Sequence, residues 1–310
     1  MLSRVADSLF WMSRYMERSD GILRMLRVNY ASFQDDITEF SWMPVLNIFS
    51  YLSKGEAASI QFDTRKVLDY MVFDKENENS VFHLVTKARE NARSVQDHIT
   101  KEVWQCINEF FHLMRERELI SGLHSEDPVQ VLDVLIRQCS LYYGTADLTM
   151  ARGEGNSFMN IGKYVERAMQ SSDILAVRLG NIKHSLDSHD SNYWRYVLLS
   201  LSGFELYLKT YRSEFMGRNV VELVMLNHEF PRSVLYSVIR MHRYFEPFKS
   251  EKNATNFNKT NFLIGKLKSK LEYSSAETLK QDQLHKFLGG VKRELHEIGV
   301  AFNVNYFMYS

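Results

Sequence analysis

The residues best suited to chemistry in this sequence are glutamates followed directly by arginines on predicted helices. Glu17-Arg18 and Glu166-Arg167 lie in two related segments, Arg14–Ser19 and Lys163–Ala168. Guanidinium groups bind carboxylate or phosphate through two parallel hydrogen bonds. Converging arginines would therefore suit an anion or peptide ligand. The candidate ligand-binding residues are Arg14, Glu17, Arg18, Arg89, Glu90, Arg93, Glu102, Lys163, Glu166 and Arg167.

The same charges also allow a structural interpretation. Arg14 and Arg18 are like charges four residues apart, and they repel each other unless something intervenes. Glu17 lies beside an apolar stripe of its helix, so we expect it to be only partly exposed. Salt bridges from Glu17 or Glu166 to an arginine of another helix would explain the clusters equally well.

Other catalytic and metal-binding patterns are missing from the sequence. A carboxylate-bridged di-iron site needs two Glu-x-x-His motifs, and only Glu109–His112 matches, so we expect His112 on a helix surface. Gly-x-Ser-x-Gly, His-Glu-x-x-His and Cys-x-x-Cys do not occur. The loop Gly153–Gly155 lacks the lysine of a phosphate-binding loop and is interpreted as a hinge. We therefore expect no metal and no cofactor, and the chain offers no nucleophile with an obvious activating partner.

Charge and composition narrow the class of protein. The 310 residues carry 38 basic and 38 acidic side chains, which argues against nucleic acid as a partner. The basic stretch Lys249–Lys270 is interpreted as a solvated helix face. Cys106 and Cys139 fall in apolar periodic segments, typical of buried thiols in the cytoplasm. No signal peptide is recognisable, and the uncharged run Phe40–Ser53 is too short to cross a membrane.

Apolar spacing of three and four residues, with only 4 prolines, predicts an all-α fold. Phe10, Trp11 and Met25 lie off the apolar stripe of the first helix, so this helix should be buried on more than one side. The other helices are expected after Pro44, at 64–73, at 129–149, and as one helix of about 35 residues from Val81 to Leu113. Ser80 is the expected N-cap of that long helix, which a loop at Ser121–Pro128 should follow.

An internal repeat sets the expected organisation of the chain. Three segments match in order, at offsets of 149, 152 and 153 positions: Arg14–Ser19 with Lys163–Ala168, Trp42–Leu46 with Trp194–Leu198, and Ser80-Val81 with Ser233-Val234. The sequence therefore predicts an internally duplicated helical bundle with pseudo-two-fold symmetry, whose repeats are 1–150 and 151–310. Beyond about Val85 and Val238 the two sequences diverge.

Eight short segments of the chain, taken in order, resemble the bacterial alpha-E family. They are Met1–Arg4, Phe10-Trp11, Arg14–Arg18, Ala88–Val95, Glu102–Trp104, Arg152-Gly153, Gly162–Ala168 and Glu229–Val234. Glu154 departs from the family pattern, which often has proline there. The resemblance implies an all-α fold with characteristic glutamates at Glu17 and Glu166. It also implies genes that neighbour those of a circularly permuted ATP-grasp ligase-like protein and a transglutaminase-like cysteine peptidase.

Three hypotheses for function follow. The first is a non-catalytic partner or scaffold in an ATP-grasp-associated system of peptide synthesis or modification. The second is an enzyme or an anion- or peptide-binding protein that uses Glu17, Glu166 and the arginine clusters. The third, nucleic-acid binding through Lys249–Lys270, lacks support from net charge. The aromatic-rich segment Val300–Tyr309 is expected to dock into its own core, with a partner-facing strip as the alternative.

Overall fold

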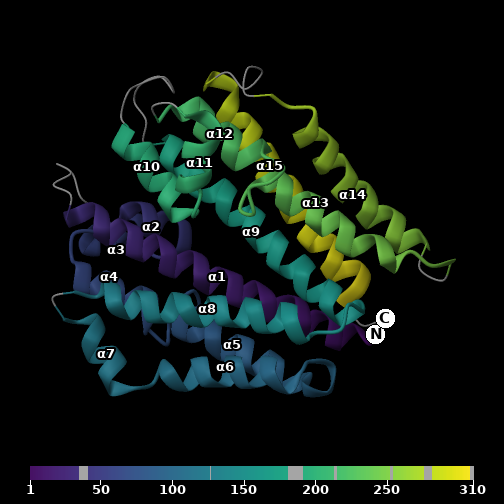
Figure 1. The fold of residues 1–310 in the computed structure, drawn as a ribbon, viewed down its shortest axis with the longest axis horizontal. Coiled ribbons are helices and arrows are strands. Elements are labelled where there is room, and N and C mark those ends of the chain that lie inside the picture. The colour runs from purple at the N-terminus through teal and green to yellow at the C-terminus, as the bar shows by residue number, and fades with distance from the viewer. Residues whose placement is uncertain are drawn as a thin grey trace. The chain divides into compact units, whose positions relative to one another are not determined.

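A computed structural model describes residues 1–34, 41–125, 127–180, 191–212, 215–251, 254–275 and 281–307. These residues form fifteen α-helices and contain no β-strand (Figure 1). The prediction of an all-α fold is confirmed. No helix within the described ranges is long and apolar enough to span a membrane.

The chain forms two compact units. The first unit comprises residues 11–156, and the second unit comprises residues 157–310 together with residues 1–10. The sequence had assigned the first ten residues to the first repeat. Phe10 explains why they group with the second unit, because its ring lies 5.9 Å from that of Phe302 and 5.0 Å from that of Phe307. Gly162 also permits this approach, since a Cβ there would meet the Phe10 carbonyl oxygen.

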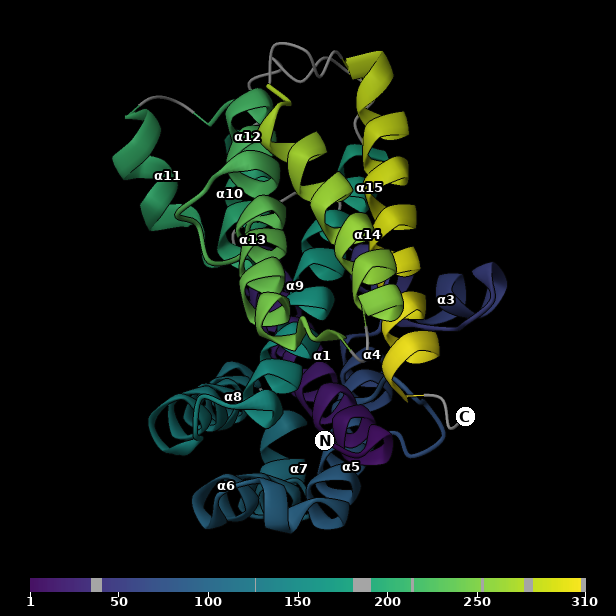
Figure 2. The ribbon, with the colours of Figure 1, turned by 90° about the vertical axis from the view of Figure 1, so that its right-hand side faces the viewer.

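The first unit begins with most of one long helix and ends with another. Its helices are α1 (Ser3–Gln34, from residue 11), α2 (Met43–Phe49), α3 (Lys54–Ile60), α4 (Thr64–Val72), α5 (Val81–Ser94), α6 (Lys101–Leu113), α7 (Arg117–Leu123) and α8 (Val129–Thr149). Helix α6 packs against both α5 and α8, as Figure 2 also shows.

The second unit is built in a similar order. Its helices are α9 (Glu154–Gly180, from residue 157), α10 (Ser191–Ser200), α11 (Phe204–Tyr211), α12 (Gly217–Leu226), α13 (Val234–Phe245), α14 (Ala254–Glu272) and α15 (Gln281–Phe302). Helix α14 packs against both α13 and α15. A π-helical turn, Asn303–Phe307, follows α15.

The order of elements continues to agree where the sequences no longer match. In each unit a 3₁₀ turn follows the fifth helix, at Gln96–His98 in the first unit and Glu246–Phe248 in the second. The next helix then packs against the fifth and against the last. Helix α7 has no counterpart among the described residues of the second unit. The agreement in element order therefore extends beyond Val85 and Val238.

The single helix predicted from Val81 to Leu113 is wrong. It is interrupted between α5 and α6, where Ile99 is extended and Thr100 caps α6 by accepting a hydrogen bond from the Val103 N–H. β-Branched residues at 95, 99 and 100 weaken a helix there. Reversal of the chain lets α5 pack against α6, which buries Ala88 within the unit.

The predicted loop Ser121–Pro128 also begins too early. Helix α7 continues to Leu123, because Leu119 and Leu123 lie on one buried face. Helix α3 was missed, although Ser53 and Glu56 form a reciprocal capping box that can be read in the sequence.

Several local predictions are confirmed. Helix α8 has the predicted bounds, and α4 lies within 64–73. Ser80 caps α5 by accepting a hydrogen bond from the His83 N–H. Phe10 and Met25 are buried in α1.

The C-terminal aromatic segment docks into its own unit, where Phe302 and Phe307 are buried. Residues 308–310 lie outside the described part of the chain.

Candidate functional site

A turn with the same hydrogen bonds precedes α5 and α13. Ser80 and Ser233 are both buried, and each side-chain oxygen accepts from the N–H three residues later, at 3.1 and 2.9 Å. Each hydroxyl also donates to a backbone carbonyl six residues earlier, that of Asp74 or Asn227. We call these segments, 74–80 and 227–233, the Ser-capped turns.

Side chains at the start of each turn repeat the same pattern. An Asp74 carboxylate oxygen accepts from the Glu76 N–H at 2.8 Å, and the Asn227 amide oxygen accepts from the Glu229 N–H at 2.8 Å. A Ser hydroxyl that satisfies the first turn of a helix stabilises it by about 1 kcal/mol. These turns therefore orient the fifth helix of each unit.

The arginine of each Glu-Arg dipeptide binds the Ser-capped turn of its own unit. Arg18 donates to the side-chain oxygen of Asn79 at 3.0 Å. Arg167 donates to the backbone carbonyl of Pro231 at 3.3 Å, and one turn later along α9 the Ser171 hydroxyl donates to the Arg232 carbonyl at 2.7 Å. Both arginines thus connect the first long helix of a unit to the turn before its fifth helix.

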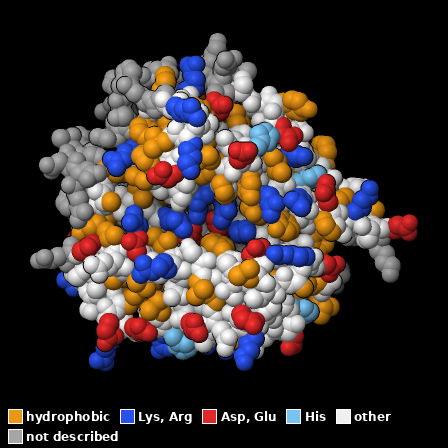
Figure 3. Space-filling model, viewed as in Figure 1, with side chains coloured by type: hydrophobic (Ala, Val, Ile, Leu, Met, Phe, Trp, Pro, Cys, Tyr) orange, Lys and Arg blue, Asp and Glu red, His pale blue; other side chains and the backbone are white. Residues whose placement is uncertain are grey.

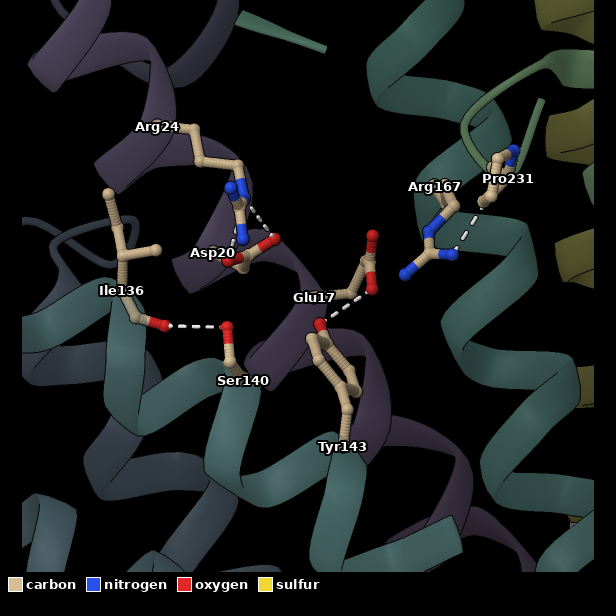
Figure 4. A network of polar contacts seen from close by, with 8 residues as sticks. All are labelled: Glu17, Asp20, Arg24, Ile136, Ser140, Tyr143, Arg167 and Pro231. Atoms are coloured by element: carbon tan, nitrogen blue, oxygen red, sulfur yellow. Dashed lines mark hydrogen bonds and ion pairs between the residues drawn. The ribbon is translucent and has the colours of Figure 1, made fainter. Parts of the chain in front are cut away.

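The glutamate of each dipeptide is buried. Glu17 is 0% exposed and accepts a 2.6 Å hydrogen bond from the Tyr143 hydroxyl of α8, as Figure 4 shows. Glu166 is 3% exposed and accepts from the Gln170 amide at 3.4 Å. Partial exposure was expected for Glu17, and its burial is more complete than expected. A buried carboxylate needs such donors to offset its loss of hydration.

A second buried carboxylate lies next to Glu17 on α1. Asp20 is 0% exposed and forms an ion pair with Arg24 at 2.9 Å (Figure 4). The guanidinium Nε also lies 3.0 Å from the other carboxylate oxygen. The charge of Asp20 raises the pKa of Arg24 against the effect of burial, which lowers it.

The cations three residues before Glu17 and Glu166 stack on aromatic rings. The Arg14 guanidinium lies 4.5 Å from the Trp11 ring centroid, and the Lys163 ammonium lies 4.7 Å from that of Tyr164. Cation–π contacts of this kind stabilise a cation while leaving it able to donate hydrogen bonds.

The remaining candidates lie apart from these clusters. Arg89 donates to Asn108 at 2.7 Å and stacks over Phe111. Glu90 pairs with Lys87 at 3.2 Å. Arg93 and Glu102 are exposed. Among the described residues, none of Arg89, Glu90, Arg93 and Glu102 forms a hydrogen bond or ion pair with Arg14, Glu17 or Arg18.

The possible metal ligands and the two thiols are placed as follows. No group of three or more His, Cys, Asp or Glu residues within the described part of the chain is placed to hold a metal, and His112 is exposed as expected. Cys106 and Cys139 are buried free thiols. Burial raises the pKa of Cys106 to about 11 and that of Cys139 well above its ordinary value, so both stay protonated and unreactive at neutral pH.

The predicted solvated face around Lys249–Lys270 consists largely of ion-paired lysines. Lys266 and Lys270 flank Glu294 at 3.5 and 3.4 Å, and Lys268 pairs with Glu272. Lys252 lies outside the described residues. Figure 3 shows acidic and basic side chains interspersed over the visible face, in keeping with the zero net charge.

Comparison with known families connects these dipeptides to a described motif. A family described as a predicted alpha-helical domain with a conserved ER motif, Alpha-E, matches residues 1–307. The chain belongs to the Alpha-E family. Glu-Arg occurs three times in the sequence, and Glu116-Arg117 is exposed at the start of α7. In Glu17-Arg18 and Glu166-Arg167, by contrast, the glutamate is buried and the arginine bonds a Ser-capped turn.

Curated relatives of this Alpha-E protein are longer and uncharacterised. An uncharacterised protein of Mycobacterium bovis and two of Mycobacterium tuberculosis are 23% identical to it over 330 residues. The match covers 95% of this chain but 36% of each relative, so the chain spans about a third of their length. No solved structure matches the chain.

Residues outside the candidate set complete these environments. Tyr143 and Asn79 hold Glu17 and Arg18, and Arg240 of α13 lies near Tyr164. No sequence motif marks them, because their partners are 61 to 126 positions away. The offset of the repeat could have indicated the segments 74–80 and 227–233 as equivalent, but not their contacts with the arginines.

Proposed function

We propose that this Alpha-E protein is a non-catalytic helical scaffold that binds an ATP-grasp ligase-like protein in a system of peptide synthesis or modification. A transglutaminase-like peptidase is a further proposed partner. The observation that carries the proposal is the use of both Glu-Arg dipeptides within their own units. Their arginines hold the Ser-capped turns, and their glutamates are buried.

The physical argument against the alternative, an enzyme or anion- or peptide-binding protein that uses Glu17 and Glu166, is that these buried carboxylates already have hydrogen-bond donors within the chain. A general acid, a general base or a ligand-binding carboxylate has to come within about 3 Å of its substrate. Glu17 is 0% exposed and Glu166 is 3% exposed. Each already accepts a hydrogen bond from a neighbouring side chain.

The length of the relatives supports a role alongside other polypeptides. The matched part is 36% of each mycobacterial relative, which leaves 100 − 36 = 64% as further sequence. Covalent linkage of two modules raises their effective concentration, so modules that act together gain from fusion. We infer that the helical domain acts with another domain or chain rather than alone.

We also propose that the scaffold arose by duplication of one helical unit. The equivalent hydrogen bonds of Ser80 and Ser233 and the parallel order of helices support this origin. A shared apolar core does not require a hydroxyl to bond a carbonyl six residues earlier, yet both units have that bond. The two buried free thiols, Cys106 and Cys139, are in keeping with a cytoplasmic location.

Co-expression with the ATP-grasp ligase-like protein of the same host tests the proposal. At micromolar concentrations the two proteins should share one peak in size-exclusion chromatography. Separate elution under these conditions would contradict the scaffold role.

A second assay separates a scaffold from a catalyst. We expect Glu17→Gln and Glu166→Gln to keep complex formation and to change product formation by the ligase less than about twofold, because neither carboxylate reacts. Glu109→Gln, on an exposed surface, is the matched control. A loss of activity above about tenfold in a folded, complex-forming Glu17→Gln or Glu166→Gln variant would favour the alternative.

A further inference from the structure

Three tyrosines and one arginine gather between α9 and α13 of the second unit. Tyr236, Arg240 and Tyr244 are four residues apart and form one stripe of α13. Tyr164 of α9 faces this stripe, with its ring 6.1 Å from the ring of Tyr236 and 6.1 Å from that of Tyr244. Tyr164 is buried, and the other three side chains are half-buried.

Arg240 occupies the centre of this cluster. Its guanidinium carbon lies 5.9, 6.0 and 5.3 Å from the ring centroids of Tyr164, Tyr236 and Tyr244. One terminal nitrogen donates to the Tyr244 hydroxyl at 3.2 Å. Its Nε is buried, and it has no hydrogen-bond partner among the described residues. A buried donor without an acceptor is costly and rare, so this nitrogen indicates a place for an acceptor.

The tyrosine hydroxyls add further donors. The Tyr244 oxygen accepts from Arg240, which leaves its own proton to be donated elsewhere. Burial raises the pKa of Tyr164 to about 12, although the charge of Arg167, a hydrogen bond from Arg240 and the charge of Arg240 oppose this rise. Tyr164 therefore keeps its proton at neutral pH and remains a donor.

Positive charge accumulates around Tyr164. The Lys163 ammonium and the Arg167 guanidinium carbon lie 4.7 and 5.6 Å from its ring centroid, in addition to Arg240. No carboxylate within the described ranges forms an ion pair with Arg240. The surroundings of Arg240 thus offer several donors and a positive field, and an oxyanion is the ligand that satisfies both.

We propose that Arg240, Tyr164 and Tyr244 form a binding site for the phosphoryl group of a small ligand. A tetrahedral phosphoryl group presents three or more acceptor oxygens in different directions, whereas a carboxylate is planar and presents two. Donors that arrive from two different helices match the tetrahedral group better. The proposal is independent of the scaffold role, because it concerns a ligand and not a protein partner.

The equivalent positions of the first unit lack this chemistry. At the offset of 153, Tyr236, Arg240 and Tyr244 correspond to 83, 87 and 91, which are His83, Lys87 and Asn91. Lys87 is already paired with Glu90. The proposed site therefore belongs to the second unit alone.

Arg89 of the first unit supplies a matched control. Its guanidinium carbon lies 4.6 Å from the Phe111 ring centroid and 5.6 Å from that of Trp104, so its aromatic packing resembles that of Arg240. Its Nε, however, donates to Asn108 at 2.7 Å. Its aromatic neighbours carry no hydroxyl groups. If binding depended only on cation–aromatic packing, Arg240→Gln and Arg89→Gln would weaken it equally.

Isothermal titration calorimetry of the full chain tests the site, with inorganic phosphate and AMP as probes in a phosphate-free buffer of low salt. We expect both to bind. Tyr244→Phe and Tyr164→Phe should each weaken binding about tenfold, because each removes one hydrogen bond to a charged group. Arg240→Gln should weaken it about a hundredfold. Arg89→Gln should stay within about twofold of the wild type.

The probes also separate two sources of the phosphoryl group. Equal affinities would assign free phosphate, and tighter binding of AMP would assign a nucleotide or similar ester; either result supports the site. Absence of binding by both probes would overturn it. Binding of citrate without phosphate, or an equal loss in Arg89→Gln, would also overturn it. Circular dichroism checks folding, and if Arg240→Gln does not fold, Tyr244→Phe decides.

Discussion

In both units the Glu-Arg dipeptide has a buried glutamate and an arginine that bonds the Ser-capped turn, but the residues around it differ. In the first unit Glu17 is followed by a second buried carboxylate, Asp20, which pairs with Arg24. In the second unit Met169 stands at the position equivalent to Asp20, since 169 − 20 = 149. The second unit instead has the cluster of tyrosines around Arg240.

The comparison shows which features the two units share and which differ between them. The features that agree between the units are hydrogen bonds to backbone groups at Ser80 and Ser233, whose loss would leave buried polar atoms unpaired. The features that differ are contacts between side chains, which can change without disturbing the path of the backbone. Within one chain, therefore, the same helical framework carries an internal ion pair in one unit and a donor-rich cluster in the other.

The largest loss of stability is expected when the two buried tryptophans, one in each unit, are replaced. Trp42 and Trp194 are almost completely buried at equivalent positions. Trp42→Ala and Trp194→Ala should each lower the free energy of unfolding by about 3–5 kcal/mol, because each leaves a large cavity. Chemical denaturation followed by circular dichroism measures the loss. If one variant costs less than about 1 kcal/mol, the units are not equivalent in packing.

The next largest effect concerns one ion pair in each unit, a buried pair in the first and a more exposed pair in the second. Asp20→Asn should destabilise the protein by about 3 kcal/mol, because it removes a fully buried carboxylate charge that pairs with Arg24, whose side chain is 25% exposed. Asp173 of the second unit pairs with Lys292 at 2.6 Å, but the lysine side chain is 55% exposed. Asp173→Asn should therefore cost below about 1 kcal/mol. The same denaturation experiment compares them, and equal losses would contradict the contrast.

A smaller effect tests the likeness of the Ser-capped turns. Ser80→Ala and Ser233→Ala should each cost about 1–2 kcal/mol, since each removes an N-cap and leaves a carbonyl unpaired. Thermal melts of both variants give the comparison. Ser59→Ala, in which the lost hydroxyl bonds the carbonyl of Glu56 three residues earlier on an exposed surface, is the control. Unequal losses at Ser80 and Ser233 would show that the two turns do not stabilise their units equally.

The smallest effect concerns the pH dependence of stability and a buried thiol of the first unit. Burial raises the pKa of Cys106, in the first unit, from 9.0 to about 11. Between these values the unfolded chain loses a proton that the folded chain keeps, so stability should fall as pH rises from 9 to 11. The drop in Tm between pH 8 and 10.5 should be smaller in Cys106→Ala than in the wild type. An identical drop would show that this thiol does not contribute.

Much of the local structure could be predicted because it depends on neighbours in the sequence. The apolar spacing of 129–149 and the hydroxyl of Ser80 act within one or two helical turns, and both predictions are confirmed. The predicted continuous helix failed at Val95–Thr100, where the apolar spacing persists although the chain reverses. Periodicity shows which face of a segment is apolar. It does not show whether the segment continues as one helix or turns back and packs against the residues that precede it.

From its residues alone this chain could be recognised as all-α, with an N-cap at Ser80 and a Glu-Arg dipeptide in each of two related segments. The surroundings of these dipeptides, however, could not be predicted without the folded chain. Tyr143 reaches Glu17 across 126 positions, and Phe10 joins Phe302 across nearly the whole chain. Such contacts depend on how apolar faces pack together, and that packing brings together side chains whose separation in the sequence carries no periodic signal.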